Sequence, residues 1–459
     1  MKDNNIWNNY TKEELNELEA LNSDYIDFLS KGKTERECVK LLIKEAELKG
    51  YKDLNEIVKM KKSLVPGDKV YSNCMDKTLL MINIGEDDIT KGMNILGAHL
   101  DSPRLDVKQN PLYENSEIAY LDTHYYGGIK KYQWVTLPLA IHGVIVKKDG
   151  TKINVVVGEN ENDPVFFISD LLIHLSAEQL EKKSAKVIEG EQLDVIVGSI
   201  PLGKEEKDAV KINILKILHD KYSIEEDDFW SAELEVVPAG PAREAGFDRS
   251  MVISYGHDDR VCAYTSMVAM LEVDKPKRTS CGLFVDKEEI GSVGATGMQS
   301  KFFENTMAEI LELMGVYSEI NLRRTLASCN MLSSDVSAAY DPTFDNVYDK
   351  KNSAMFGRGL VFNKYTGSRG KGGSNDANPE YLAYLRNILH KNNVSFQSSE
   401  LGKVDAGGGG TIAYIMALYG MNVVDSGVPV LNMHAPWEVV SKADVYEAMK
   451  GYKAFLLEA

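Results

Sequence analysis

The first 50 residues alternate polar and apolar positions with the spacing of amphipathic helices. Thr11 with Glu14, and Thr34 with Glu37, have the three-residue separation of a capping box, and Gly50 stands where a helix would end. These signals predict two helices. Later apolar runs are short and of strand length, and polar or helical segments separate them.

The pattern changes near residue 103 and changes back near residue 240. Between these points, alternating apolar segments flank Lys-Lys-Asp-Gly at residues 147–150, and Asp-Gly favours a hairpin turn. Outside them, strand and helix patterns alternate, which is typical of a mixed, largely parallel sheet sandwiched by helices. We therefore expect an α/β domain formed by residues 1–102 and 240–459, interrupted by a β-rich domain over residues 103–239.

Composition narrows the class of protein. The 44% hydrophobic and 26% charged residues are ordinary for a globular chain, and the net charge of −17 disfavours binding to nucleic acids or anionic lipids. We find no apolar run of about 20 residues, the length needed to cross a bilayer. The polar N-terminus and five scattered cysteines suit a cytoplasmic protein with reduced thiols.

Five segments of inferred strand character end in side chains that can bind a divalent cation. The segments are residues 94–100, 251–254, 281–285, 325–331 and 429–433. The side chains are His99, Asp258, Glu289, Asp335 and His434. Each alone is weak evidence, because structural histidines and helix caps look the same. Sites in open α/β sheets form at the carboxyl ends of strands, so together the five favour a metal centre.

The ligand types narrow the metal. Two imidazoles and three carboxylates without a thiolate suit zinc, manganese or cobalt. Five ligands exceed the needs of one open catalytic zinc, and a bridging carboxylate would divide them between two ions about 3.5–4 Å apart. The adjacent Glu288 and Glu289 suit a general base beside a ligand. Asp101, two residues after His99, suits a carboxylate that orients the imidazole.

Six motifs carry a resemblance to a known family: PGDKVY, GAHLDSPRLD, GHDDRV, DKEEIGS, SSDVS and LNMHAPWE. With these the chain resembles the M18 metallo-aminopeptidases of the dinuclear zinc exopeptidase clan, in family order and over nearly its whole length. The resemblance implies an enzyme that removes N-terminal amino acids from peptides. It also implies His99 and Asp335 on one zinc ion, Glu289 and His434 on the other, and Asp258 bridging both.

The same resemblance assigns further roles. It implies Glu288 as the general base, with Asp101 behind His99. His174 resembles a family histidine that reaches a neighbouring subunit's active site, although a histidine on an amphipathic helix face fits equally well. Lys364 resembles a substrate-contacting lysine. Family members insert a dimerisation domain where this chain becomes β-rich, and they assemble into large, usually dodecameric particles, which implies a homo-oligomer.

Substrate preference and two rival functions stay open. Ala338 and Asp341 stand where animal aspartyl aminopeptidases of the family carry histidines near the substrate. A preference for acidic N-terminal residues is therefore not implied, and other members prefer neutral or apolar ones. One rival is a dinuclear amidohydrolase or N-deacylase on the same scaffold. The other is a nonenzymatic assembly protein, which predicts no stoichiometric metal.

Overall fold

The computed structural model describes residues 5–203 and 207–459. The chain divides into two compact units, which are described separately below. The first comprises Met1–Asp101, Ala242–Met433 and Glu438–Ala459, and the second comprises Ser102–Pro241 with His434–Trp437. The sequence pattern did not lead us to expect that the short segment after Met433 groups with the second unit.

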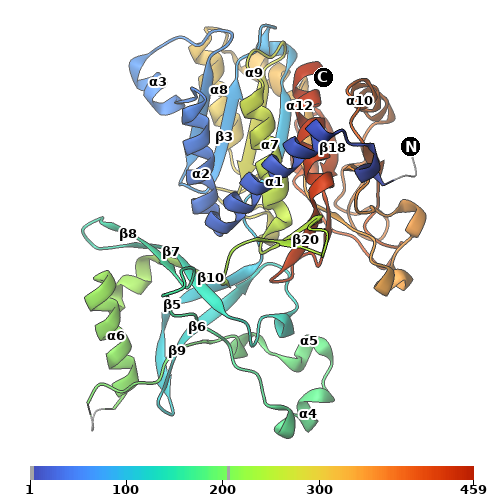
Figure 1. The fold of residues 1–459 in the computed structure, drawn as a ribbon. Coiled ribbons are helices and arrows are strands. Elements are labelled where there is room, and N and C mark those ends of the chain that lie inside the picture. Colours follow the sequence, from blue (N-terminus) through green and yellow to red (C-terminus); the bar gives the residue numbers. More distant parts are fainter. Residues whose placement is uncertain (1–4, 204–206) are drawn as a thin grey trace. The chain divides into compact units, whose positions relative to one another are not determined.

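A nine-stranded mixed sheet forms the centre of the first unit (Figure 1). In spatial order its strands are β1 (Lys52–Asp53), β2 (Lys69–Cys74), β3 (Thr78–Asn83), β13 (Ser280–Val285), β4 (Asn94–His99), β14 (Asn330–Ser334), β18 (Asn422–Gly427), β16 (Leu360–Asn363) and β17 (Phe396–Ser398). The four central strands β13, β4, β14 and β18 run parallel, and β3 and β16 flank them antiparallel. This arrangement confirms the expected fold class.

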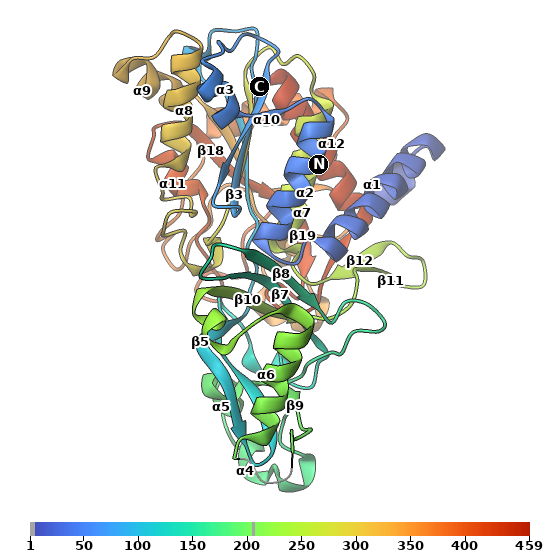
Figure 2. The same ribbon diagram turned by 90° about the vertical axis from the view of Figure 1, so that its left-hand side faces the viewer.

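Helices cover both faces of this sheet (Figures 1 and 2). One face carries α1 (Lys12–Lys31), α2 (Glu35–Leu48), α7 (His257–Glu272), α10 (Pro379–Lys391) and α12 (Lys442–Glu458), and the other carries α3 (Leu54–Met60), α8 (Phe302–Leu313), α9 (Glu319–Ala327) and α11 (Ala413–Ala417). Successive strand residues point to opposite faces, so Leu79 joins the first apolar core and Leu80 joins the second. Burial on both faces explains why the strands read as continuous apolar runs.

Both predicted helices near the N-terminus are present with their capping boxes. The Thr11 hydroxyl accepts a hydrogen bond from the Glu14 N–H, and the Glu14 carboxylate accepts one from the Thr11 N–H. Thr34 and Glu37 form the same reciprocal pair at the start of α2. Each box satisfies two N–H groups that a helix terminus would leave without partners.

The first unit also contains a five-stranded sheet, which is separate from the nine-stranded sheet. Its order is β11 (Arg243–Ala245), β12 (Met251–Ser254), β20 (Glu438–Ser441), β19 (Pro429–Leu431) and β15 (Ser337–Ala338). Strand β12 pairs antiparallel with β20, and this places Ser254 opposite Glu438. The loops after β12 and β19 therefore start from a different sheet than the loops after β4, β13 and β14.

The second unit is built on a six-stranded antiparallel sheet. Its order is β8 (Lys152–Val157), β7 (Leu139–Val146), β10 (Ala232–Pro238), β5 (Arg104–Asn115), β6 (Ile118–Tyr126) and β9 (Val195–Gly198). The expected hairpin joins β7 to β8, with the Gly150 N–H donating to the Lys147 carbonyl. Helix α6 (Ala209–Tyr222) runs along this sheet, and short helices α4 (Ala177–Leu180) and α5 (Ser184–Val187) occupy the 170–190 region (Figure 2).

One local prediction needs correction. The segment 325–331 is not one strand, because α9 continues to Ala327 and β14 begins only at Asn330. Leu322 and Leu326 of α9 are four residues apart, which is the spacing of one helix face, and both are buried in the core. A short apolar run fits either a helix or a strand, and here the helical spacing agrees with the structure. The range of α7 starts at His257, but Asp258 and Asp259 have non-helical backbone angles, so its regular part begins close to the predicted start at Val261. Within residues 5–203 and 207–459, no helix has the length and apolar character needed to cross a membrane.

Candidate metal centre

Three neighbouring parallel strands of the nine-stranded sheet bring candidate residues to one edge. His99 is the last residue of β4, and the register places it opposite Val285, the last residue of β13. Glu288 and Glu289 follow in the 3-10 helix Glu288–Ile290, and Asp335 comes directly after β14. Parallel strands carry their carboxyl ends to the same edge, which is why residues far apart in sequence meet here.

Asp258 reaches the same place from the five-stranded sheet. It lies in the first turn of α7, just after β12, and its N–H donates to Glu438 Oε2 over 2.9 Å. Glu438 lies on the paired strand β20 and is buried. The strands that precede Asp258 and His434, β12 and β19, both belong to the five-stranded sheet, whereas β4, β13 and β14 belong to the nine-stranded one.

The polar atoms of these side chains lie close together. His99 Nε2 is 3.2 Å from Asp258 Oδ1 and 3.9 Å from Asp335 Oδ1. Three groups have possible ligand atoms within 4.8 Å of one another: His99 with Asp258 and Glu289, His99 with Glu288 and Asp335, and Asp258 with Asp259 and Asp335. The structure therefore brings four of the five sequence-derived ligands and the candidate base into one acidic cluster.

The hydrogen bonds of His99 decide which ring nitrogen faces the cluster. Nδ1 lies 2.9 Å from the Asp101 carbonyl oxygen. A carbonyl oxygen can only accept, so Nδ1 carries the hydrogen and Nε2 of the neutral ring carries the lone pair. Nε2 then faces the acceptor oxygens of Asp258 and Asp335. Such a lone pair among carboxylates is stable only with a proton or a cation between them.

Electrostatics lead to the same requirement. Burial lowers the pKa of His99, but its hydrogen bonds with Asp101 and Asp258 and the nearby carboxylates raise that pKa well above its usual value. Burial raises the pKa of Asp335 well above its usual range, and neighbouring carboxylates add to the effect. Carboxylates this close repel when ionised, so a divalent cation fits the donor set.

Asp101 organises the loop that carries both glutamates. Its Oδ1 accepts the Glu288 N–H and its Oδ2 accepts the Glu289 N–H, each over 3.1 Å. Lys287, just before them, has a φ of 69°, a left-handed conformation that is uncommon outside glycine. Because Asp101 bonds to the backbone here, both glutamate side chains keep their carboxylates for other partners.

Sequence reasoning missed two residues of this cluster, Asp259 and Glu438. Asp259 is fully buried, and its Oδ2 accepts the His99 N–H over 3.4 Å. Burial raises the pKa of Asp259 well above its usual value, and the charge of Asp258 raises it further. The consecutive aspartates of GHDDRV were a visible signal, but only the pairing of β12 with β20 places Glu438 beside Asp258.

The other sequence-derived candidates are not members of these three groups. His434 belongs to the second unit, where its Nδ1 donates to the Gly128 carbonyl over 2.9 Å, so Nε2 carries the lone pair of the neutral ring, as in His99. His174 lies exposed in the 3-10 helix Ile173–Leu175 of that unit. Lys364 is exposed after β16 and lines a cleft between β16, β17 and α10 with Phe362.

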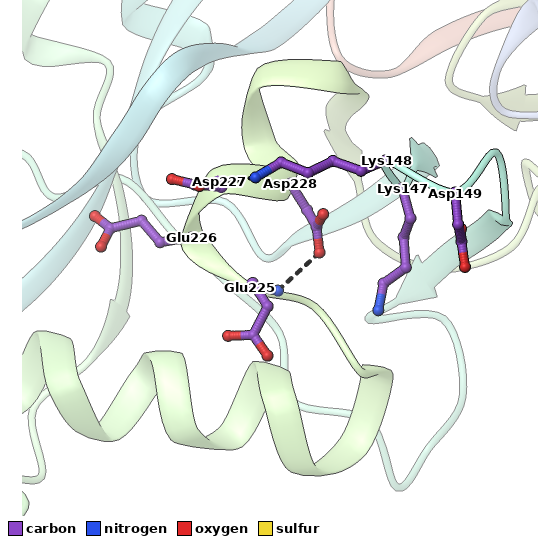
Figure 3. A pocket seen from close by; sticks show the side chains of 7 residues that line it. All are labelled: Lys147, Lys148, Asp149, Glu225, Glu226, Asp227 and Asp228. Carbon is purple, nitrogen blue, oxygen red and sulfur yellow. Dashed lines mark hydrogen bonds and ion pairs between the residues drawn. The ribbon is translucent and has the colours of Figure 1, made fainter.

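A surface depression in the second unit has a different character. It lies between the 147–150 turn and residues Glu225–Asp228, and Figure 3 shows its charged lining. Lys148 Nζ contacts Asp227 over 3.2 Å, and Asp228 accepts the Glu225 N–H over 2.9 Å. Its acids therefore pair with lysines and backbone, and none of the sequence-derived site residues lies in its lining.

The chain is similar to known proteins over nearly its whole length. Residues 28–456 match a family model described as Aminopeptidase I zinc metalloprotease (M18). A probable M18 family aminopeptidase 1 from Clostridium acetobutylicum is 63% identical over 453 residues, covering 98% of this chain and 97% of that protein. Aminopeptidase I from the same organism has a solved structure with a TM-score of 0.93 at 60% identity, covering 99% of both chains. An M18 aminopeptidase structure from Thermotoga maritima has a TM-score of 0.95 at 43% identity and covers 100% of both chains.

Proposed function

The chain belongs to the M18 family of zinc metallo-aminopeptidases, and we propose that its acidic cluster is a two-zinc site that removes N-terminal amino acids from peptides. The observation that supports this most directly is His99 Nε2 facing two carboxylates at 3.2 and 3.9 Å. The family description names zinc, and the imidazole and carboxylate donors suit that metal.

Each sequence-derived ligand has a place in this proposal. His99 and Asp335 would hold one ion, Glu289 would hold the other, and Asp258 would bridge them. His434 is assigned to the second ion from its motif alone. Zinc held there would lower the pKa of a water molecule and polarise the scissile carbonyl.

The remaining acidic groups handle protons and the substrate amine. Glu288 accepts the proton of the attacking water and then delivers it to the leaving amine. Asp101 holds the Glu288 and Glu289 backbone in place through its two N–H···O bonds. Acidic side chains at the site attract the positively charged α-amino group of a peptide, which explains action at the N-terminus rather than within the chain.

Adjacent glutamates with different roles allow a matched test. Glu288→Gln should reduce kcat by at least about a hundredfold while two zinc equivalents remain, because a base is lost but no ligand. Glu289→Gln should lose one equivalent. Elemental analysis of purified variants together with steady-state kinetics measures both. Near-wild-type turnover in Glu288→Gln would reject its role as the base.

His434 needs a separate measurement because only its motif supports its assignment. We expect His434→Ala to retain one zinc equivalent and lose the other. His219→Ala is the matched control, because this exposed histidine of α6 lies in the same unit and pairs with Asp220 and Glu225. Two full equivalents in His434→Ala would contradict the assignment.

The rival hydrolase differs in its need for a free amine. An aminopeptidase cleaves an aminoacyl-nitroanilide and rejects its N-acetylated twin, whereas an N-deacylase acts on acylated amino acids. We expect activity only on the free amine, with neutral or apolar N-terminal residues preferred over Asp and Glu. Faster hydrolysis of acetylated substrates would favour the deacylase.

We also propose a cytoplasmic homo-oligomer that assembles through the inserted unit. The five cysteines are unpaired in the structure, which suits a reducing compartment. Leu172, Ile173 and Leu175 around His174 are exposed, and such apolar patches mark interaction surfaces. Light scattering should report a mass near that of a dodecamer, and His174→Ala should lower activity without changing that mass. A monomeric active enzyme would contradict assembly.

A further inference from the structure

An apolar cavity of about 650 Å³ lies inside the second unit, between α6 and the six-stranded sheet. Its floor includes Ile141 and Ile145 of β7 and Val155 and Val157 of β8. Within each strand these residues are spaced by an even number, so they project from the same face of the sheet. The volume falls in the range of about 300–1,000 Å³ that is typical of small-molecule sites.

Helix α6 forms the opposite wall without closing the space. Ile214, Ile217 and Leu218 line the cavity, yet Val210 is the one buried residue of the helix. A helix this apolar normally buries a stripe of side chains against its sheet. Here that stripe faces open volume, and exposed Val165, at 50%, and Ile217, at 38%, mark the entrance.

Polar groups in the lining are few. The lining residues Lys221, Tyr222 and Ser199 carry such groups. Among the residues that the structure describes, none with a carboxylate side chain lines the cavity, although the chain carries a net charge of −17. A single cation beside an apolar chamber complements a ligand with a long apolar body and one negative end.

We propose that this cavity binds an aliphatic carboxylate, with its chain between α6 and the sheet and its head group at Lys221. The cavity is walled by both the sheet and the helix, which fits a slender chain better than a folded protein surface. The site consists of residues of the second unit alone, so it does not depend on the proposed peptidase chemistry.

A chain-length series tests the apolar part on the full-length protein. Calorimetric titration with hexanoate, octanoate and decanoate should give one site per chain, with Kd falling about fourfold for each added methylene. Decanol tests the charged end, because the same chain without a carboxylate should bind more weakly. Equal Kd values across the series, or decanol binding as tightly as decanoate, would overturn the proposal.

Variants then locate the site. Ile217→Trp should weaken decanoate binding by about tenfold or more by occupying the volume, and Lys216→Trp, at an exposed position outside the lining, is the matched control. Lys221→Gln should weaken decanoate by about two- to fivefold and leave decanol unchanged. Leu218→Phe is the alternative filling variant if Ile217→Trp does not fold.

A second copy of the chain is the competing occupant of this face. Sedimentation of the same variants distinguishes it, because ligand binding predicts an unchanged mass for Ile217→Trp. A smaller assembly in Ile217→Trp, together with no detectable decanoate binding by the wild type, would show that the cavity is an interface between copies and overturn the proposal.

Discussion

Asp335 and Asp444 are both carboxylates of the first unit with a raised pKa, but their surroundings differ. Burial raises the pKa of Asp444 to about 7, and its two oxygens accept the N–H groups of Gly357 and Gly359 over 2.8 and 2.7 Å. Burial also raises the pKa of Asp335, where further acids, among them Asp259, raise it more. Backbone donors satisfy the first carboxylate, whereas the second lies among groups of its own charge.

From this difference we interpret Asp444 as a structural acid and Asp335 as the proposed metal ligand. Asp444 stabilises the start of α12 by binding two backbone amides in the turn before β16. Asp335 gains no such compensation from its carboxylate neighbours, so we expect a bound cation to stabilise the folded state at this position. A raised pKa alone therefore does not identify an active site, and the identity of the neighbouring groups does.

The largest expected effect separates the two acids by activity. Asp335→Asn should lose bound zinc and reduce kcat/KM by about a thousandfold or more, because an electrostatic contact at the reacting centre disappears. Asp444→Asn should keep both zinc equivalents and stay within about threefold of wild-type kcat/KM, because losing one hydrogen bond acts mainly on stability. Elemental analysis and kinetics on both variants give the result, and equal losses in the two would remove the distinction.

Local sequence signals predicted much of this fold because the forces behind them are local. Capping boxes at Thr11 and Thr34 act within four residues, and the strand runs ending at His99 and Val285 are buried on both faces. The prediction of one strand over residues 325–331 was wrong because local signals were not sufficient there. A short apolar run fits a helix or a strand until its packing partners are known.

The site was predicted less completely because part of it depends on long-range pairing. Asp258 and Glu438 are 180 residues apart, and the antiparallel register of β12 with β20 brings them together. Motif resemblance gave Asp258 a role but none to its partner, although Glu438 is the last residue of the motif LNMHAPWE. Likewise, the fully buried His257, beside Asp258, bonds to Tyr25 of α1 over 2.7 Å, a contact that no local pattern encodes.

The second prediction concerns pH and Asp444. Folded Asp444 holds its proton up to about pH 7, whereas an unfolded Asp releases it near pH 4. Its contribution to the free energy of unfolding is therefore complete below about pH 4 and falls by about 1.4 kcal/mol per pH unit up to about pH 7. Asp444→Asn mimics the neutral acid and should lack this term. Denaturant unfolding at several pH values measures the wild-type difference from the variant, and a difference that does not change with pH would contradict the raised pKa.

Zinc removal should lower the Tm of the Asp335 variant less than that of the Asp444 variant. Zinc at a hundred times its Kd stabilises the folded state by about 2.7 kcal/mol, so chelation should lower the Tm of wild type and of Asp444→Asn by similar amounts. Asp335→Asn, with its site already impaired, should show a smaller decrease. Calorimetric scans with and without chelator provide the measurement, and an equal decrease in all three proteins would mean that Asp335 does not contribute to zinc binding.

The smallest expected effect on kcat/KM tests whether Asn363, which contacts the segment after Asp335, also contributes to activity. Ser337, two residues after Asp335, donates its hydroxyl to Asn363 Oδ1 over 3.1 Å. Lys364, the residue after β16, lines the cleft between β16, β17 and α10. We expect Asn363→Ala to reduce kcat/KM about fivefold by releasing Ser337. Lys364→Ala removes an exposed cation 3.9 Å from Asp376 and should change kcat/KM by less than about twofold. A larger effect of Lys364→Ala than of Asn363→Ala would support the substrate contact that the family resemblance assigns to Lys364.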